Sequence, residues 1–230
     1  MLQPNESDAM SNPGIIKNPP APRVEPAIIA RLHGIAVSLL SDQLHRSCGS
    51  VGLQPYHAPA PMAGTAVTVR TRGGDNLAIL RAYDFCRPGD VMVVDAGGDV
   101  TNALVGGIMT FAAAKQGLAG MVLDGAIRDV AEIRQRTFPV YARGVNHRGP
   151  YKDGPGEINV PVTIGGMVVN PGDIIVGDQD GLLAFSPHLA ATIIEKALAQ
   201  AEKEEATMQA IRDGRWDRSF VDALEARCAN

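Results

Sequence analysis

The chain has 230 residues, with 25 acidic against 21 basic side chains, so its formal charge is -4 at pH 7. This balance argues against a protein that binds nucleic acid through a basic face, and we expect no nucleic-acid partner. A hydrophobic fraction of 45% without any apolar run near the ~18 residues of a membrane-spanning helix predicts a globular, cytoplasmic protein with no membrane segment.

Residues 1–26 are predicted to form an extended, proline-rich arm that packs on a neighbouring subunit or lacks fixed structure. They contain six of the sixteen prolines and little apolar periodicity. From Ala27 to His45 the apolar residues recur at spacings of three and four, which predicts one amphipathic helix in spite of Gly34.

The middle of the chain alternates between strand and helix patterns. The predicted elements, in order, are a strand at 65–71, a helix at 75–86, a strand at 91–94, a helix at 107–115, a strand at 120–124, a short helix at 129–136 and a strand at 140–143. This alternation is typical of βαβ units, which form parallel sheets.

The last third begins with a glycine- and proline-rich loop, 145–156, and continues mostly as strand to Phe185. Pro187 then opens a long helix with one apolar stripe, whose charge run at 202–205 is typical of a solvated face. We therefore predict one α/β domain over residues 27–213, with residues 214–230 as a C-terminal tail.

The three cysteines, Cys48, Cys86 and Cys228, are far apart and include no C-x-x-C pair. Neither a disulfide framework nor a structural zinc site is indicated. We expect buried thiols, because free cysteine is among the most buried residue types.

Glycines at 106 and 107 open the predicted 107–115 helix, and a further glycine pair lies in the run Asp95-Ala-Gly-Gly-Asp99 that follows the predicted strand at 91–94. Backbone N–H groups at such a helix start, with the positive end of the helix dipole behind them, can bind a carboxylate or phosphate. Alternatively, these glycines serve only tight turns and close packing of a helix on a sheet.

Arg128 and Asp129 belong to the run Asp124-Gly-Ala-Ile-Arg128-Asp129, which lies at the C-terminal end of the predicted strand at 120–124. The carboxyl ends of strands in open α/β sheets are where ligands gather. Arg128 offers a planar fork for an oxo acid, and Asp129 could hold a Mg²⁺ or Mn²⁺ ion that keeps several waters. The alternatives are a local ion pair, or Asp129 as the N-cap of the following helix.

A set of motifs in this order resembles one known family over roughly residues 34 to 205. The set comprises Leu40-Ser-Asp-Gln-Leu44, Gly64-Thr-Ala-Val-Thr68, Pro88-Gly-Asp-Val91, Asp95-Ala-Gly-Gly98, Ala103-Leu-Val-Gly106, Gly120-Met-Val-Leu-Asp-Gly125, Arg128-Asp129, Pro139-Val-Tyr-Ala-Arg-Gly144, Pro171-Gly-Asp173 and Gly177-Asp-Gln-Asp-Gly181. The family unites the class II 4-hydroxy-4-methyl-2-oxoglutarate aldolases with the regulator of ribonuclease E activity.

The resemblance implies a single-domain β/β/α fold like the swivelling phosphohistidine domains, assembled as a homotrimer or as a hexamer, with active sites between subunits. It implies that Asp129 holds a divalent metal, Mg²⁺ or Mn²⁺, and that Arg128 contacts a 2-oxo acid. The backbone amides of Gly106, Gly107, Ile108 and Met109 would receive the carboxylate of that acid, and Glu204 of a neighbouring subunit would reach the metal through water.

The chemistry of the residues agrees with a lyase. A 2-oxo acid can chelate a metal, and the enolate that develops as its C3–C4 bond breaks would be stabilised by the metal and by Arg128. Retro-aldol cleavage also needs a base for the C4 hydroxyl, whereas decarboxylation of oxaloacetate does not. One site can therefore run both reactions.

The chain departs from the aldolases at Gly107, where they typically carry Asp or Glu to hold a catalytic water. We hypothesise that Asp99, Asp124 or a water on Glu204 substitutes, and that otherwise decarboxylation is favoured over retro-aldol cleavage.

Two functional readings follow from the resemblance. The first is a metal-dependent lyase that cleaves or decarboxylates 2-oxo acids, with Arg128, Asp129 and Glu204 in the catalytic machinery. The second is a non-catalytic trimeric regulator that binds an RNA-processing enzyme. The Arg128–Asp129 pair favours the lyase, since a pure regulator has no need of a metal-binding carboxylate. A methyltransferase is discounted, because no glycine signature for a methyl donor is present.

Overall fold

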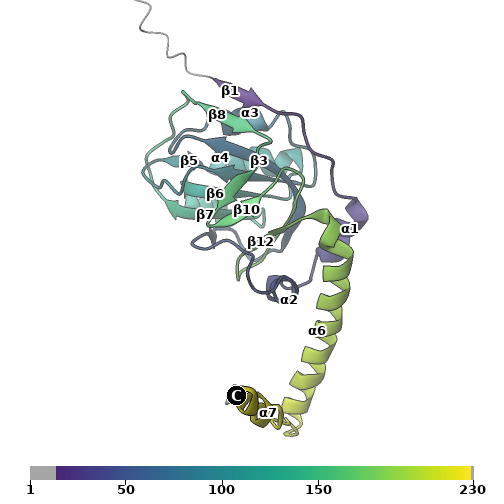
Figure 1. Ribbon diagram of the computed structural model, residues 1–230. Helices are drawn as coiled ribbons and strands as arrows, with labels where there is room; N and C mark the ends of the chain where they lie inside the picture. The colour runs from purple at the N-terminus through teal and green to yellow at the C-terminus, as the bar shows by residue number, and fades with distance from the viewer. Residues whose placement is uncertain (1–13, 229–230) are drawn as a thin grey trace, which may run out of the picture.

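A mixed β-sheet forms the centre of the molecule, and the computed structural model describes residues 14–228 (Figure 1). Its strands are β1 (Ile15–Lys17), β2 (Gln54–Pro55), β3 (Met62–Thr71), β4 (Asp90–Asp95), β5 (Ala103–Val105), β6 (Gly120–Ile127), β7 (Val140–Val145), β8 (Gly156–Ile158), β11 (Ile174–Gly177) and β12 (Leu182–Phe185). The main path of the sheet runs β1-β8-β3-β4-β6-β7-β2, and a separate hairpin joins β9 (Val162–Ile164) to β10 (Met167–Val169).

The centre of the sheet is parallel, as the βαβ pattern predicts. Strands β3, β4, β6 and β7 pair in parallel, and β5 adds to β6 in the same direction. All eight residues of β6 are buried. Continuous burial is expected of a parallel strand that is covered on both faces, and it explains the unbroken apolar sequence here.

The helices are α1 (Pro26–Leu32), α2 (Val37–Gln43), α3 (Leu77–Ala82), α4 (Gly107–Gln116), α5 (Val130–Ile133), α6 (Ala190–Arg212) and α7 (Phe220–Cys228), and a 3-10 turn at Pro187–Leu189 precedes α6. The prediction of one helix from Ala27 to His45 is wrong, because the chain breaks between α1 and α2. Gly34 has a φ of +89° there, a left-handed conformation that ends a helix at little cost for glycine.

Two hydrophobic clusters hold the helices on the sheet. One joins α3 and α4 to β4 and β6 through buried residues such as Ile79, Ala113, Met92 and Leu123. The other joins α1, α2 and the first half of α6 to β11 and β12. The structure confirms the prediction of a single mixed α/β domain with a long C-terminal helix.

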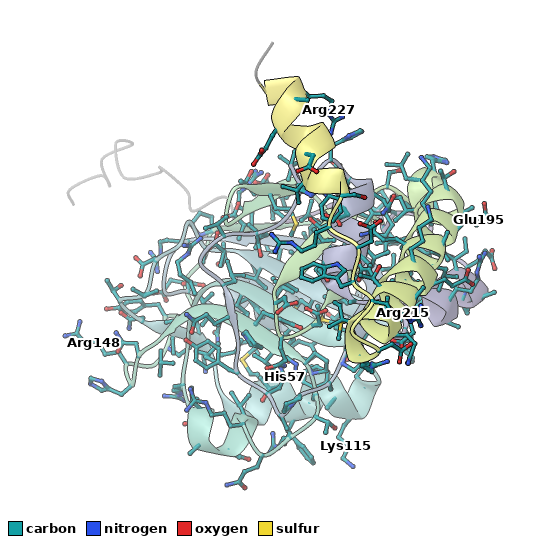
Figure 2. All side chains as sticks on the ribbon, turned by 90° about the horizontal axis from the view of Figure 1, so that it is seen from below. His57, Lys115, Arg148, Glu195, Arg215 and Arg227 are labelled. Atoms are coloured by element: carbon teal, nitrogen blue, oxygen red, sulfur yellow. The ribbon has the colours of Figure 1, made fainter. Side chains whose placement is uncertain are left out.

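Helix α6 leaves the body of the protein after its first turns (Figure 1). Its buried residues all lie between Ala190 and Ala197, and the rest of the helix carries mostly exposed side chains (Figure 2). Helix α7 follows within the predicted tail. None of the described helices is long and apolar enough to cross a membrane.

The arm is described from Gly14 onward, and residues 1–13 lie outside the described part. Strand β1 pairs in parallel with β8, and Arg23 forms an ion pair of 2.8 Å with the buried Asp90. The expectation of buried thiols holds for Cys86 but is wrong for Cys48, which is exposed in the loop after α2. The side chain of Cys228 lies outside the described part.

Candidate active site

Two parallel strands end side by side and bring the two candidate motifs together. Strand β5 pairs with β6 so that Val105 lies opposite Ile127, and the Arg128 N–H donates to the Val105 carbonyl at 3.0 Å. Gly106 at the start of α4 therefore lies next to Arg128. This is the carboxyl edge of the sheet, where ligand sites in α/β folds form.

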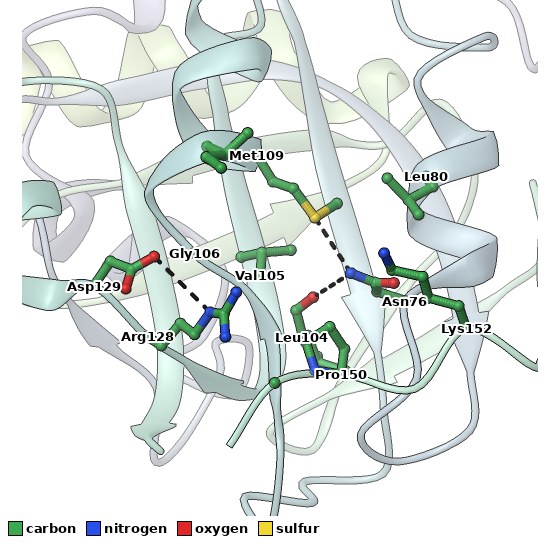
Figure 3. A pocket seen from close by; sticks show the side chains of 12 residues that line it. Asn76, Leu80, Leu104, Val105, Gly106, Met109, Arg128, Asp129, Pro150 and Lys152 are labelled. Atoms are coloured by element: carbon green, nitrogen blue, oxygen red, sulfur yellow. Dashed lines mark hydrogen bonds and ion pairs between the residues drawn. The ribbon is translucent and has the colours of Figure 1, made fainter. Parts of the chain in front are cut away.

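A pocket of about 400 Å³ opens at this edge (Figure 3). Its wall combines residues from the start of α3, from β5 and α4, from the end of β6 and from the 149–152 loop. The lining residues are Asn76, Leu80, Leu104, Val105, Gly106, Ile108, Met109, Arg128, Asp129, Gly149, Pro150 and Lys152.

Asp129 has an unusual backbone conformation, with φ 60° and ψ 34°. Non-glycine residues adopt this left-handed region infrequently, and such strain is concentrated at functional sites. The conformation turns the carboxylate toward α4, where its Oδ2 accepts a hydrogen bond of 2.9 Å from the Gly107 N–H. Asp129 occupies the N-cap position of α5, as the alternative reading expects, but its side chain makes no capping hydrogen bond there.

The local ion pair is present but loose. The Arg128 Nε and Asp129 Oδ2 atoms are 3.9 Å apart, and the two side chains are 44% and 47% exposed. An exposed pair of this kind contributes little to stability, typically ~0–1 kcal/mol. Both groups therefore remain accessible to a ligand from the pocket (Figure 3).

Gly106 is required by the close approach of this pair. A Cβ atom at position 106 would lie 2.9 Å from Arg128 Cγ and still closer to the Asp129 carboxylate. The glycine therefore does more than form a turn, since it lets the helix start and the Arg128–Asp129 segment come into contact.

Glu132 occupies the space beside Gly107. A Cβ atom at position 107 would lie 3.0 Å from Glu132 Cδ and closer still to Oε2. Arg136 holds this arrangement, because it forms an ion pair with Glu132 and its Nη1 donates to the Gly107 carbonyl at 3.1 Å. The Glu132 side chain is 54% exposed. A carboxylate thus lies at the second residue of the helix start, although position 107 itself has none.

Tyr83 supports the first turn of α4 from the other side. Its hydroxyl donates to the Met109 carbonyl at 2.6 Å. Burial raises the pKa of Tyr83 far above its usual range, with a smaller contribution from the nearby Cys86. The hydroxyl therefore stays protonated and can donate its hydrogen to the Met109 carbonyl.

The charges of the pocket favour an anionic ligand. Arg128 and Lys152 both line it, and the N-terminus of α4 adds its positive dipole end. Asp129 is the only carboxylate among the residues of the described chain that line this pocket. This arrangement of two basic side chains and one carboxylate suits an anionic ligand that also coordinates a cation held by Asp129.

The structure brings together most of the predicted site residues. Gly106, Ile108, Met109, Arg128 and Asp129 all line the pocket, and Gly107 adjoins it with its N–H already donated to Asp129.

Three acidic residues named from the sequence lie elsewhere. Glu204 is exposed on the protruding part of α6, where Gln200 donates to it at 2.9 Å. Asp99 accepts from Thr101, and the buried Asp124 pairs with Arg143 and accepts from the Gly165 N–H at 2.9 Å. Within this chain, then, neither Asp99 nor Asp124 is the acid beside Gly107.

The donors present suit a hydrated divalent cation. Asp129 supplies hard carboxylate oxygens to the pocket, and its side chain is about half exposed. No cluster of three or more metal-binding side chains occurs within residues 14–228. Mg²⁺ is commonly held by one or two carboxylates with water in its other positions, so this small set fits such an ion.

Sequence reasoning missed Glu132, Asn76 and Lys152. Glu132 follows Asp129 by three residues, the spacing of an N-cap residue and the third residue of a helix, and this signal could have identified it. Asn76 and Lys152 reach the pocket from segments far away in the chain. Nothing in their local sequence marks them.

Comparison with known proteins identifies the family. The family model described as RraA-like, Aldolase/RraA, matches residues 37–184. A protein of Halalkalibacterium halodurans that carries the name "Putative 4-hydroxy-4-methyl-2-oxoglutarate aldolase" is 37% identical over 186 residues, which make up 80% of this chain and 89% of that protein.

Solved structures agree in fold. RraAS2 of Streptomyces coelicolor, described as an unusual member of the RNase ES inhibitor RraA protein family, has a TM-score of 0.76 at 26% identity, over 82% of this chain and 99% of its own. The RNA-processing inhibitor RraA of Thermus thermophilis has a TM-score of 0.60 at 31% identity, over 66% of this chain and 92% of its own. Because the family model matches well over half of its length, the chain belongs to the Aldolase/RraA family.

Proposed function

We propose that this protein is a divalent-metal-dependent lyase that breaks a carbon–carbon bond of 2-oxo acids and releases pyruvate. The reactions are retro-aldol cleavage of 4-hydroxy-2-oxo acids and decarboxylation of oxaloacetate. The observation that carries the proposal is the juxtaposition of Arg128 and Asp129 with the N-terminus of α4 in one pocket. The name of the Halalkalibacterium halodurans relative supports the same class of substrate.

The start of α4 is suited to the substrate carboxylate. The Gly107 N–H is donated to Asp129, so the neighbouring amides of Gly106, Ile108 and Met109 would be the donors. Free N–H groups in the first turn of a helix bind anions well, because they lack partners within the helix and the dipole favours negative charge.

Arg128 would stabilise the negative charge that develops on the oxygen at C2 as the bond at C3 breaks. Its guanidinium lines the pocket, 44% exposed, and is only loosely engaged by Asp129. A fixed positive group aimed at a developing oxyanion lowers the barrier more than it improves ground-state binding.

Asp129 would hold the cation, Mg²⁺ or Mn²⁺, with water in most of its other positions. When bound, the ion supplies Lewis-acid stabilisation of the negative charge at C2. Retro-aldol cleavage also requires that the C4 hydroxyl lose its proton. Glu132, rather than Asp99 or Asp124, is the acid placed beside Gly107 to take that proton through a water.

The complete site would lie between subunits of a homotrimer or hexamer in the cytoplasm. Ile108 lines the pocket and is 86% exposed, so one side of the site is uncovered in a single chain. Helix α6 carries Glu204 away from its own body (Figure 1). In the proposed assembly, Glu204 of a neighbouring subunit would complete the site.

The alternative is a non-catalytic regulator that binds an RNA-processing enzyme. The two solved structures named above are described as an RNA-processing inhibitor and as a member of an RNase ES inhibitor family. Retention of Arg128 and Asp129 in an open pocket favours the lyase, because binding to a protein partner does not need them.

The test is pyruvate release from oxaloacetate and from a panel of 4-hydroxy-2-oxo acids, with Mg²⁺, with chelator, and with Mg²⁺ restored after chelation. The proposal expects release that chelator abolishes and Mg²⁺ restores. Release that is unchanged by chelator would contradict metal dependence, and no release from any acid would favour the regulator.

A further inference from the structure

One buried polar atom in the pocket wall has no partner. Asn76 is 2% exposed, and its Oδ1 has no hydrogen-bond partner among residues 14–228. The residue lines the pocket that holds Arg128 and Asp129. A buried acceptor without a donor is costly and infrequent in folded proteins, so an atom of this kind beside a cavity indicates a ligand donor.

The orientation of the Asn76 amide is fixed by its neighbours. Its Nδ2 donates to the Leu104 carbonyl at 3.0 Å and contacts Met109 Sδ at 3.4 Å, and both contacts are visible in Figure 3. A carbonyl oxygen can only accept, so turning the amide over would place two acceptors against each other. Oδ1 is therefore the atom left without a protein donor.

The backbone at Asn76 is equally constrained. Its N–H donates to the Tyr151 carbonyl at 3.0 Å, and its carbonyl accepts from Leu80 within α3 at 2.9 Å. The preceding Asp75 accepts from the Leu77 N–H at 2.9 Å. Because both flanks are tied down, Asn76 cannot easily move to find another donor.

We infer that Asn76 Oδ1 accepts a hydrogen bond from a hydroxyl group of the bound 2-oxo acid, which makes Asn76 a specificity-determining residue for hydroxylated substrates. The inference rests on the proposed function. Arg128 and Lys152 make the pocket favourable to anions, and carboxylate and keto groups carry no donor. On such a ligand, the donor that suits Oδ1 is a hydroxyl.

Asn76 acts on substrate binding rather than on bond breaking. The hydroxyl proton points to Asn76 in the bound state, and rotation about the C4–O bond then presents it to the base. The loss of an interaction made in the ground state raises KM and does not lower kcat.

The test compares two acids that differ by one hydroxyl, 4-hydroxy-2-oxoglutarate and 2-oxoglutarate, in the presence of Mg²⁺. The KM of the first and the inhibition constant of the second are measured for wild type, Asn76→Leu, Leu80→Ala and Lys152→Met. Leu80 lines the same pocket but offers no polar side-chain atom, and Lys152 is a cationic donor that lines it.

For Asn76→Leu we expect KM to rise about tenfold or more, the inhibition constant of 2-oxoglutarate to stay within about twofold, and kcat to stay within about threefold. Leu80→Ala should shift both constants together, and Lys152→Met should keep the preference for the hydroxylated acid. Equal shifts of both constants in Asn76→Leu, or loss of the preference in Lys152→Met, would overturn the inference.

Calorimetry separates this inference from the proposed function. If wild type releases pyruvate from none of the acids of the panel, the proposed function fails, and binding of 4-hydroxy-2-oxoglutarate and 2-oxoglutarate still tests Asn76. Tighter binding of the hydroxylated acid that is lost in Asn76→Leu would support the inference, and equal binding by wild type would overturn it.

Discussion

The carboxylate of Glu132 lies against Gly107, in the space that a side chain at position 107 would need. The two residues come from different helices, α5 and α4, and Arg136 contacts both of them. An acid beside the helix start is thus provided by α5, and the absence of a side chain at position 107 is what makes room for it.

This arrangement predicts how Gly107 and Glu132 depend on each other. Gly107→Ala should change the unfolding free energy by less than about 1 kcal/mol, because the half-exposed Glu132 carboxylate must turn away from the new methyl group while alanine favours the helix. In a Glu132→Ala background the same change should be stabilising, since nothing has to move. Urea unfolding of the four proteins measures this coupling. An equal effect in both backgrounds would show that the residues do not contact each other.

Glu132→Gln should separate the two lyase reactions. Retro-aldol cleavage should fall by about 100-fold, the lower end of the contribution of a general base, whereas oxaloacetate decarboxylation should fall much less because it has no hydroxyl to deprotonate. Glu195→Gln, at an exposed position of α6, is the control and should leave both rates unchanged. Equal losses in both reactions would argue against a role in proton transfer.

Asp75 should be the most sensitive carboxylate near the pocket. It is fully buried, and its side chain accepts from Leu77, Asp153 and Gly154 N–H groups and pairs with Arg72. Asp75→Ala leaves these donors without an acceptor and should cost about 3 kcal/mol or more of unfolding free energy.

The matched control for Asp75 is Asp84→Asn, which breaks the exposed Arg81–Asp84 pair. Its unfolding free energy should change by less than about 0.5 kcal/mol. Similar urea midpoints for the Asp75 and Asp84 variants would contradict the conclusion that the hydrogen bonds and ion pair of Asp75 stabilise the fold.

The two described cysteines should differ sharply in reactivity. Burial raises the pKa of Cys86 to about 12, with a smaller contribution from Asp90, so the thiol remains protonated at pH 8. Cys48 is exposed. In a Cys228→Ser variant, a thiol reagent at pH 8 should therefore modify one site, Cys48, as mass spectrometry of peptides would show. A raised pKa means that Cys86 gains thiolate character only as the pH approaches that value, so modification of native Cys86 at pH 8 would contradict this account.

Local patterns predicted the centre of the fold well. The alternation of apolar strands with helices gave the parallel pairing of β3, β4, β6 and β7, and the glycine pair marked the start of α4. Local patterns failed where tertiary contacts decide. The break at Gly34 depends on a left-handed backbone, and the three residues of β5 form a strand only because β6 lies beside them.

The site was predictable to the extent that it is local in sequence. Arg128 and Asp129 follow a strand directly, which placed them at the ligand edge of the sheet. The contact of Asp129 with Gly107 depends on a positive φ that the sequence does not specify. Asn76 and Lys152 join the site through the packing of distant segments, so no local pattern could identify them.

The central claim is that Asp129 holds the cation that the lyase reaction requires. The most direct measurement is Mg²⁺-dependent pyruvate release from oxaloacetate by wild type, Asp129→Asn and the control Asp84→Asn, with Mg²⁺ binding followed by calorimetry. Asparagine tolerates the left-handed backbone at this position, so the fold should be kept. We predict that Asp129→Asn loses Mg²⁺ binding and at least about 100-fold in rate, while Asp84→Asn matches wild type. A folded Asp129→Asn protein with the Mg²⁺ affinity and rate of wild type would contradict the account.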